Sequence, residues 1–226
     1  MSDIDEKLVE LIRKTATATA LTCAVPKEDW SYSDVRARWA TWSEKDREDF
    51  CREWSRKQTW NSDDVQILEL LMAEANDHIW QYACTQTLLK HPNRERAVRF
   101  LIHLISNHRL QHEPLNYIQV LGMFRHKLGA EAVRPFYEKF SRALEAEATT
   151  GVPEDVHFGP LPYHEFFVAA GAMFEICGSP EYELAIRRYF DHPNEQVRWW
   201  AEHALGVEGP TTTHRNELFK KFLAEK

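Results

Sequence analysis

Hydrophobic residues recur along most of this chain with the spacing of an α-helix. The clearest example lies in residues 191–206, DHPNEQVRWWAEHALG, after a polar turn that contains Pro193. The apolar positions there follow one another at i, i+3, i+4, i+7 and i+8, and they are Val197, Trp200, Ala201, Ala204 and Leu205. This spacing places all of them on one face of a helix. We expect Gly206 to end that helix, because glycine readily adopts positive φ.

The same period recurs through the chain and predicts an all-α protein without strands. Polar turns, prolines and glycines divide the pattern into separate helices. The expected helices are Asp3–Ala20, Ser31–Trp42, Glu44–Gln58, Ser62–Ala75, Asp77–Lys90, Glu95–Ser106, Leu115–Lys127, Ala130–Ala148, Tyr163–Cys177, Pro180–Phe190, Glu195–Leu205 and Thr213–Ala224. A Ser43-x-x-Asp46 capping box opens the third of these helices. Gly129 is expected to end the seventh, and Thr213 is the expected N-cap of the last.

Two segments depart from the pattern of short amphipathic helices. The expected helix Tyr163–Cys177 is apolar nearly all round, which is typical of a buried central helix. The connection Thr149–Pro162 is longer than most loops, and loops of that length tend to be functional or mobile. It carries Glu154 and Asp155 without a nearby base, followed by His157. We expect this connection to contribute binding residues.

The helix pair near the C-terminus resembles a HEAT repeat. In residues 191–206 the pattern D-x-x-x-x-x-V-R-x-x-A-x-x-A-L-G is similar to the second helix of such a repeat, and residues 180–190 supply a first helix. The likeness is looser over residues 62–177 and absent before them. The resemblance implies an α-solenoid, that is, an α-α superhelix of HEAT-like antiparallel helix pairs whose surface binds partners. It implies no particular chemistry.

The first 60 residues differ in composition, because five of the eight tryptophans fall between residues 30 and 60. Helical spacing places Val35, Trp39 and Trp42 on one face of the expected helix Ser31–Trp42. It places Phe50 and Trp54 on one face of the next expected helix. We interpret these rings as a packed core rather than as a cage for a ligand. The sequence therefore predicts an aromatic-rich N-terminal helical cap over residues 1–60. The HEAT-like repeats follow over 61–226, in one continuous domain.

The charge of the chain bears on its partners. The net charge is −7 and the pI is about 5.9. A duplex-binding protein usually presents a basic face, so this acidity counts against nucleic acid and against an anionic membrane. It favours another protein, one with a basic surface, as the partner.

The sequence shows no signal for export or membrane insertion. The N-terminus lacks the apolar stretch of a signal peptide, and the longest apolar run, Phe166–Phe174, is too short to span a bilayer. The four cysteines lie far apart and form no C-x-x-C pair, which is typical of reduced thiols rather than of zinc ligands. We therefore expect a cytoplasmic protein.

Two His-Glu dipeptides support an alternative in which the protein is a metalloenzyme. The dipeptides are His112-Glu113 and His164-Glu165. The string YHEFFVAAG around the second is similar to the metal-site helix of deoxyhypusine hydroxylase, a HEAT-repeat enzyme, and this resemblance implies a di-iron cofactor. The chain departs from that family because it offers two such pairs where the family has four, and Trp199-Trp200 stand where another would lie. A HEAT-like DNA glycosylase is a further alternative, against which the acidity counts.

The preferred hypothesis is a non-enzymatic, protein-binding α-solenoid without a cofactor, acting as an inhibitor, an immunity-type protein or an adaptor. The sequence contains no G-x-S-x-G, P-loop or H-E-x-x-H motif. Trp199 is the most specific candidate, because it points away from the predicted buried face and shares its side with His203. It is either an interface anchor or covered by the expected helix Thr213–Ala224. The predicted contact residues are Trp199, His203, Glu154, Asp155 and His157.

Overall fold

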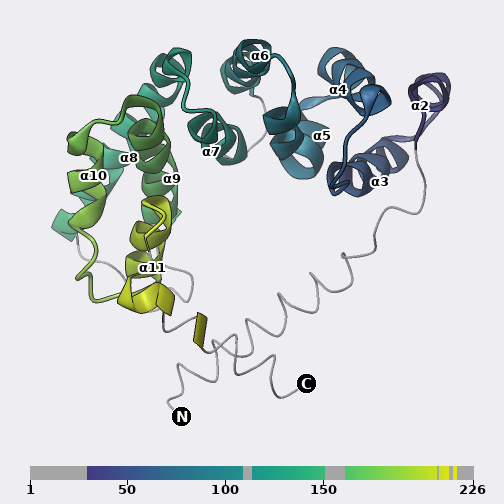
Figure 1. The fold of residues 1–226 in the computed structure, drawn as a ribbon. Coiled ribbons are helices and arrows are strands. Elements are labelled where there is room, and N and C mark those ends of the chain that lie inside the picture. Colours follow the sequence, from purple (N-terminus) through teal and green to yellow (C-terminus); the bar gives the residue numbers. More distant parts are fainter. Residues whose placement is uncertain (1–29, 109–113, 151–160, 208, 214–215, 218–226) are drawn as a thin grey trace.

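The computed structural model describes residues 30–108, 114–150, 161–207, 209–213 and 216–217, and all of its regular structure in these ranges is helical. Figure 1 shows the helices following one another along an arc in the order of the sequence, from α2 to α11. The helices are α2 (Tyr32–Trp39), α3 (Glu44–Ser55), α4 (Ser62–Glu74), α5 (Asp77–Ile79), α6 (Arg94–Ser106), α7 (Leu115–Met123), α8 (Ala130–Thr150), α9 (Leu161–Cys177), α10 (Pro180–Arg187) and α11 (Glu195–Ala204). The all-α prediction is confirmed for these residues, whereas the expected helix Asp3–Ala20 lies outside them.

Polar side chains begin several helices by accepting hydrogen bonds from the free amides of the first turn. The predicted capping box of α3 is present, because Ser43 and Asp46 each accept a hydrogen bond from the other's backbone N–H. Asn61 and Asp64 form a second box at α4. At the other end of the chain, Gly206 follows α11 with φ of 63°, as expected of a residue that ends a helix.

An aromatic cluster packs α2, α3 and the start of α4 together. Its rings lie 4.8–6.4 Å apart between centroids, and they belong to Trp30, Trp39, Trp42, Phe50, Trp54 and Trp60. The buried carboxylate of Asp64 joins this cluster to α4, because it accepts a hydrogen bond from the indole of Trp54 at 3.0 Å and pairs with Lys57 at 2.9 Å. The predicted aromatic packing near the N-terminal helices is therefore confirmed.

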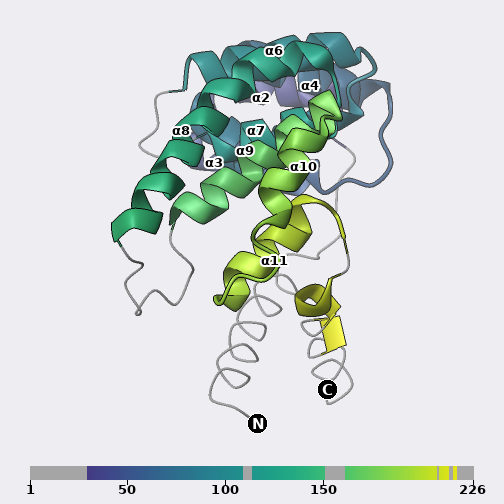
Figure 2. The ribbon, with the colours of Figure 1, turned by 90° about the vertical axis from the view of Figure 1, so that its left-hand side faces the viewer.

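Helix α9 is the centre of the C-terminal half of the fold. It packs against α7, α8, α10 and α11, and Figure 2 shows it running between α8 and α10. Buried side chains occur all round it, and they are Tyr163, Phe166, Phe167, Ala169, Ala170, Ala172, Met173 and Ile176. The prediction of a buried central helix is confirmed. Within the described residues, no helix is long and apolar enough to cross a membrane.

The prediction of a regular α-helix over Asp77–Lys90 is wrong, although these residues are helical. A single α-helical turn, α5, passes into a π-helical turn at Trp80–Cys84 and then into 3₁₀ turns at Thr85–Lys90. The hydroxyl of Thr85 donates to the carbonyl of Trp80, and that of Thr87 donates to the carbonyl of Cys84. Such bonds from threonine back to the chain compete with the regular α-helical ladder.

Helix α7 ends earlier than predicted. Its last residue is Met123, and Arg125 adopts a left-handed φ of 51° beyond it. Gly129 does not end α7 but is buried where a Cβ would lie 2.9 Å from Leu121 Cγ. The expected connection Thr149–Pro162 is shorter, because α8 and α9 extend into both of its ends. Its residues 151–160 lie outside the described residues.

The prediction that Thr213 caps the last helix is wrong, because residues 210–213 are already helical. The carboxylate of Glu202 supplies the cap from α11: it accepts hydrogen bonds from the amides of Thr211 and Thr212 and from the hydroxyl of Thr212. Burial alone would raise the pKa of Glu202, but these hydrogen bonds outweigh it and hold the pKa below its ordinary value. A negative charge at the first turn of a helix is stabilising.

The central position of α9 yields a prediction about stability. Phe167 is 2% exposed, whereas Phe174 on the same helix is only half-buried. We expect Phe167→Ala to lower the free energy of unfolding by about 3–5 kcal/mol, because a cavity would replace the ring. Phe174→Ala should cost less. Denaturant unfolding checks both, with Leu184→Ala as the control, since Leu184 is 59% exposed. Equal costs for the two phenylalanines would contradict the assigned position of α9.

The Glu202 cap predicts a pH dependence. Because the folded pKa is depressed, the stabilisation is present above the unfolded pKa and is lost as the pH falls through the folded pKa. We expect Glu202→Gln to lower the free energy of unfolding by about 1–2 kcal/mol at neutral pH. The difference from the wild type should shrink below about pH 5. Unfolding curves across this range, with Glu138→Gln as an exposed control, measure it. A difference that does not change with pH would exclude the charge as its cause.

Candidate functional site

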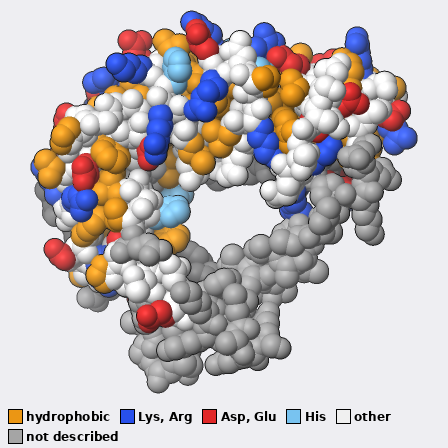
Figure 3. Space-filling view, viewed as in Figure 1, with side chains coloured by type: hydrophobic (Ala, Val, Ile, Leu, Met, Phe, Trp, Pro, Cys, Tyr) orange, Lys and Arg blue, Asp and Glu red, His pale blue; other side chains and the backbone are white. Residues whose placement is uncertain are grey.

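A cleft of about 640 Å³ opens between α7, α9 and α11. Helix α9 forms its base, and α7 and α11 form its walls. The space-filling view shows hydrophobic and histidine surface on this part of the molecule, facing the inside of the arc (Figure 3). A concave site of this volume with mixed apolar and polar lining is typical of ligand-binding clefts.

The base of the cleft is formed by small residues that bring the helix backbones close together. A Cβ on Gly122 of α7 would lie 2.7 Å from Cα of Ala172 on α9, so the two helices touch there. A Cβ on Gly171 would lie 3.1 Å from the carbonyl oxygen of Ala204 on α11. Only small residues lie at these contacts. The larger side chains farther along each helix surround the open space of the cleft.

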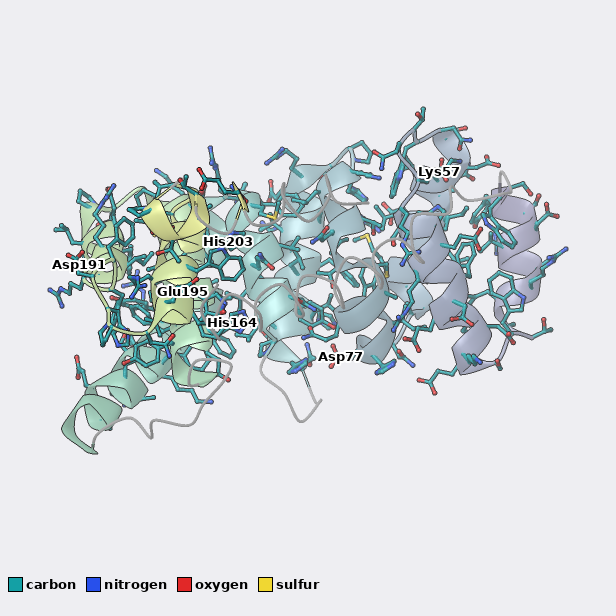
Figure 4. The ribbon with its side chains drawn as sticks, turned by 90° about the horizontal axis from the view of Figure 1, so that it is seen from below. Lys57, Asp77, His164, Asp191, Glu195 and His203 are labelled. Atoms are coloured by element: carbon teal, nitrogen blue, oxygen red, sulfur yellow. The ribbon has the colours of Figure 1, made fainter. Side chains whose placement is uncertain are left out.

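Two pairs of aromatic and imidazole rings lie where the α11 wall of the cleft meets its α9 base. Trp199 stacks on His203 within α11, with 5.4 Å between the ring centroids and 16° between the planes. Trp200 packs against His164 of α9 at 4.9 Å. Figure 4 shows both labelled histidines on the side of α9 and α11 that faces α7. Both tryptophans are half-buried, and both line the cleft.

The opposite wall is more polar and comes from α7. Asn116 and Gln119 lie one helical turn apart on it, and Met123, 51% exposed, follows. The amide of Asn116 donates to the carbonyl of Gln81 at 2.6 Å, which fixes its orientation. Just beyond α7, Arg125 lines the cleft and pairs with Glu175 of α9 at 2.5 Å.

The charge of the cleft differs from that of the chain as a whole. Among the described residues that line it, Glu175 is the only carboxylate, and Arg125 already pairs with it. Burial, followed by the neighbouring His203, lowers the pKa of His164 below its ordinary value, so this imidazole is neutral at neutral pH. Arg125 and Glu175 offset each other, and His164 adds no charge at neutral pH.

The structure places the predicted contact residues in two groups. Trp199 and His203 line the cleft together. Glu154, Asp155 and His157 lie outside the described residues, as does most of the expected helix Thr213–Ala224.

The predicted buried face of α11 needs correction. Val197 and Ala201 are buried, but Trp200, Ala204 and Leu205 are only half-buried. Trp200 lines the cleft beside Trp199, and its ring packs against His164 of α9.

The candidate metal residues are not brought together in the described part of the chain. His112 and Glu113 lie outside it, and His164 lines the cleft while the adjacent Glu165 does not. No group of three or more His, Cys, Asp or Glu residues converges among the described residues. An iron site through these pairs therefore gains no support from the described geometry.

Sequence reasoning missed most of the cleft. The sequence marks His164 only as a candidate metal ligand, and it gives no reason to select Asn116, Gln119 or Gly122. The available signal was the run of small residues VAAGA in α9, which permits close helix packing on more than one side. The spacing of the polar residues on α7 gives no indication of which helix they face.

No protein-family model, curated protein sequence or solved structure matches this chain. The resemblance of residues 180–206 to a HEAT repeat therefore rests on those residues alone.

The small residues at the base of the cleft can be tested directly. We expect Gly122→Ala to lower the free energy of unfolding by about 1–3 kcal/mol, because the new methyl group would force α7 away from Ala172. Gln119→Ala, on the exposed side of the same helix, is the matched control and should be close to neutral. Denaturant unfolding measures both changes. A Gly122→Ala protein as stable as the wild type would show that α7 and α9 do not touch here.

Proposed function

We propose that the protein is a non-enzymatic α-solenoid that binds a segment of another protein in the cleft between α7, α9 and α11, as an inhibitor or an adaptor. The observation that carries the proposal is the pair Trp199 and Trp200. They are consecutive residues of α11, both are half-buried, and both line one cleft. Tryptophans in such positions are the side chains that contribute most often to binding energy in protein interfaces.

Two observations support the solenoid part of the proposal. The helices follow the arc from α2 to α11 (Figure 1), and the extensive contacts join elements that are consecutive or separated by one or two others in the chain. Helices α10 and α11 are joined by a short turn and pack on each other and on α9, which is the arrangement expected of a stacked helical repeat. The HEAT-like residues lie in this pair.

The form of the cleft favours a peptide segment as its occupant. Aromatic rings on one wall offer apolar area, and the amides of Asn116 and Gln119 on the other offer hydrogen bonds. A peptide that enters between them can bury an apolar side chain against the indoles and pair its backbone with the amides. The described lining includes no serine, threonine or cysteine that could act as the nucleophile of a covalent acyl transfer.

Selection from a random-peptide display library on the folded protein tests this function. We expect selection to enrich related peptides, whose affinity is then measured by fluorescence anisotropy. Trp199→Ala and Trp200→Ala should each weaken binding by about 2 kcal/mol or more, roughly thirtyfold. Leu184→Ala, an exposed change on α10, is the control that should leave affinity unchanged.

The melting temperature of each variant separates contact from packing. If Trp199 is an interface anchor, Trp199→Ala should leave the melting temperature nearly unchanged while affinity falls. A clear drop in melting temperature with peptide binding intact would assign Trp199 to packing. If selection enriches no peptide, or if the enriched peptides bind both tryptophan variants as tightly as the wild type, the proposed function is wrong.

A further inference from the structure

We infer that the segment bound in the cleft carries an acidic side chain, which the protein holds between His164, His203 and the neighbouring donors. This inference rests on the proposed function and adds the chemistry of the occupant. It is carried by two histidines that come from α9 and α11, 39 residues apart in the sequence, and line the same cleft (Figure 4).

The groups that face the cleft favour a negative rather than a positive occupant. Arg125 and Glu175 pair with each other, so the imidazoles of His164 and His203 are the groups in the cleft that a bound side chain would meet. A cationic side chain would find Glu175 alone, and that carboxylate is already paired with Arg125. A carboxylate from a partner would instead meet imidazole N–H groups, and charge-assisted hydrogen bonds of this kind are among the stronger ones.

The net charge of −7 does not exclude an acidic segment. Interactions between exposed charges are largely screened beyond about 8 Å at physiological ionic strength, so groups inside the cleft outweigh distant carboxylates. The titratable and charged groups that line the cleft are few: Arg125 follows α7, His164 and Glu175 belong to α9, and His203 belongs to α11.

Binding of a carboxylate must then be linked to proton uptake. In the free protein, burial and His203 keep the pKa of His164 low, which disfavours the charged imidazole. A bound carboxylate beside the imidazoles would stabilise their charged forms and raise their pKa values. An imidazole whose pKa is higher in the complex than in the free protein increases the affinity for the carboxylate. This increase is fully present below the free pKa, and it is lost as the pH rises through the pKa of the complex.

The selected peptides supply the probe. We expect Asp or Glu at one position of the enriched sequence, and affinity higher at about pH 5.5 than at about pH 7.5, by up to about tenfold for each pKa that rises by one unit. A synthetic peptide with that residue replaced by Asn or Gln should bind more weakly at the lower pH and lose most of the pH dependence. Fluorescence anisotropy measures both peptides under the two conditions.

Histidine variants test whether the pH dependence of peptide binding arises from the histidines of the cleft. His164→Gln and His203→Gln should each reduce the pH dependence, and the double variant should abolish it and bind more weakly at both pH values. His103→Gln is the matched control, because His103 is exposed on α6 and does not line the cleft. Circular dichroism at both pH values confirms that each variant is folded.

The possible outcomes separate this inference from the proposed function. Enriched peptides that are neutral or basic, or that bind with the same affinity at both pH values, would overturn the acidic occupant while the peptide-binding function stands. A pH dependence that persists in the double variant would also overturn it. Failure to enrich any peptide would overturn both proposals together.

Discussion

The close approach of three helices at small residues is the constraint on which the candidate site depends. Gly122 lies against Ala172, and Gly171 lies against Ala204, so α7 and α11 both rest on the backbone of α9. Helices at such short distances cannot interdigitate large side chains at the contact itself. Trp199 and Trp200 therefore stand beside the contact and not within it. Only small residues fit where α7 and α11 contact α9. The bulky side chains lie to either side of these contacts, and the cleft is the space between them.

The helices could be predicted from the sequence where local chemistry and long-range packing agree. The capping box at Ser43 and the positive φ of Gly206 depend on a few neighbouring residues, and both are present. The prediction failed where side chains compete with the helical ladder, as Thr85 and Thr87 do. It failed again at Gly129, where tertiary packing against Leu121, rather than a helix end, accounts for the small residue.

The site was less predictable than the fold because it depends on which helices become neighbours. Helical spacing correctly put Trp199 and His203 on one side of α11, since that relation is local. The spacing also put Trp200 in the buried face, since a periodic pattern does not show how deep a neighbouring helix will pack. His164 faces this helix only because Gly171 lets α9 and α11 meet. No property of residues 164 and 203 read separately indicates that they converge.

Net charge and local charge act on binding over different distances. The whole chain carries −7, which governs solubility and long-range attraction, and from it a basic partner was expected. A docked side chain, in contrast, interacts with the few groups within hydrogen-bond reach, and the only carboxylate of the described lining is neutralised by Arg125. The long-range field and the cleft can therefore select for different parts of one partner. A basic surface would speed the encounter, and an acidic residue would occupy the cleft.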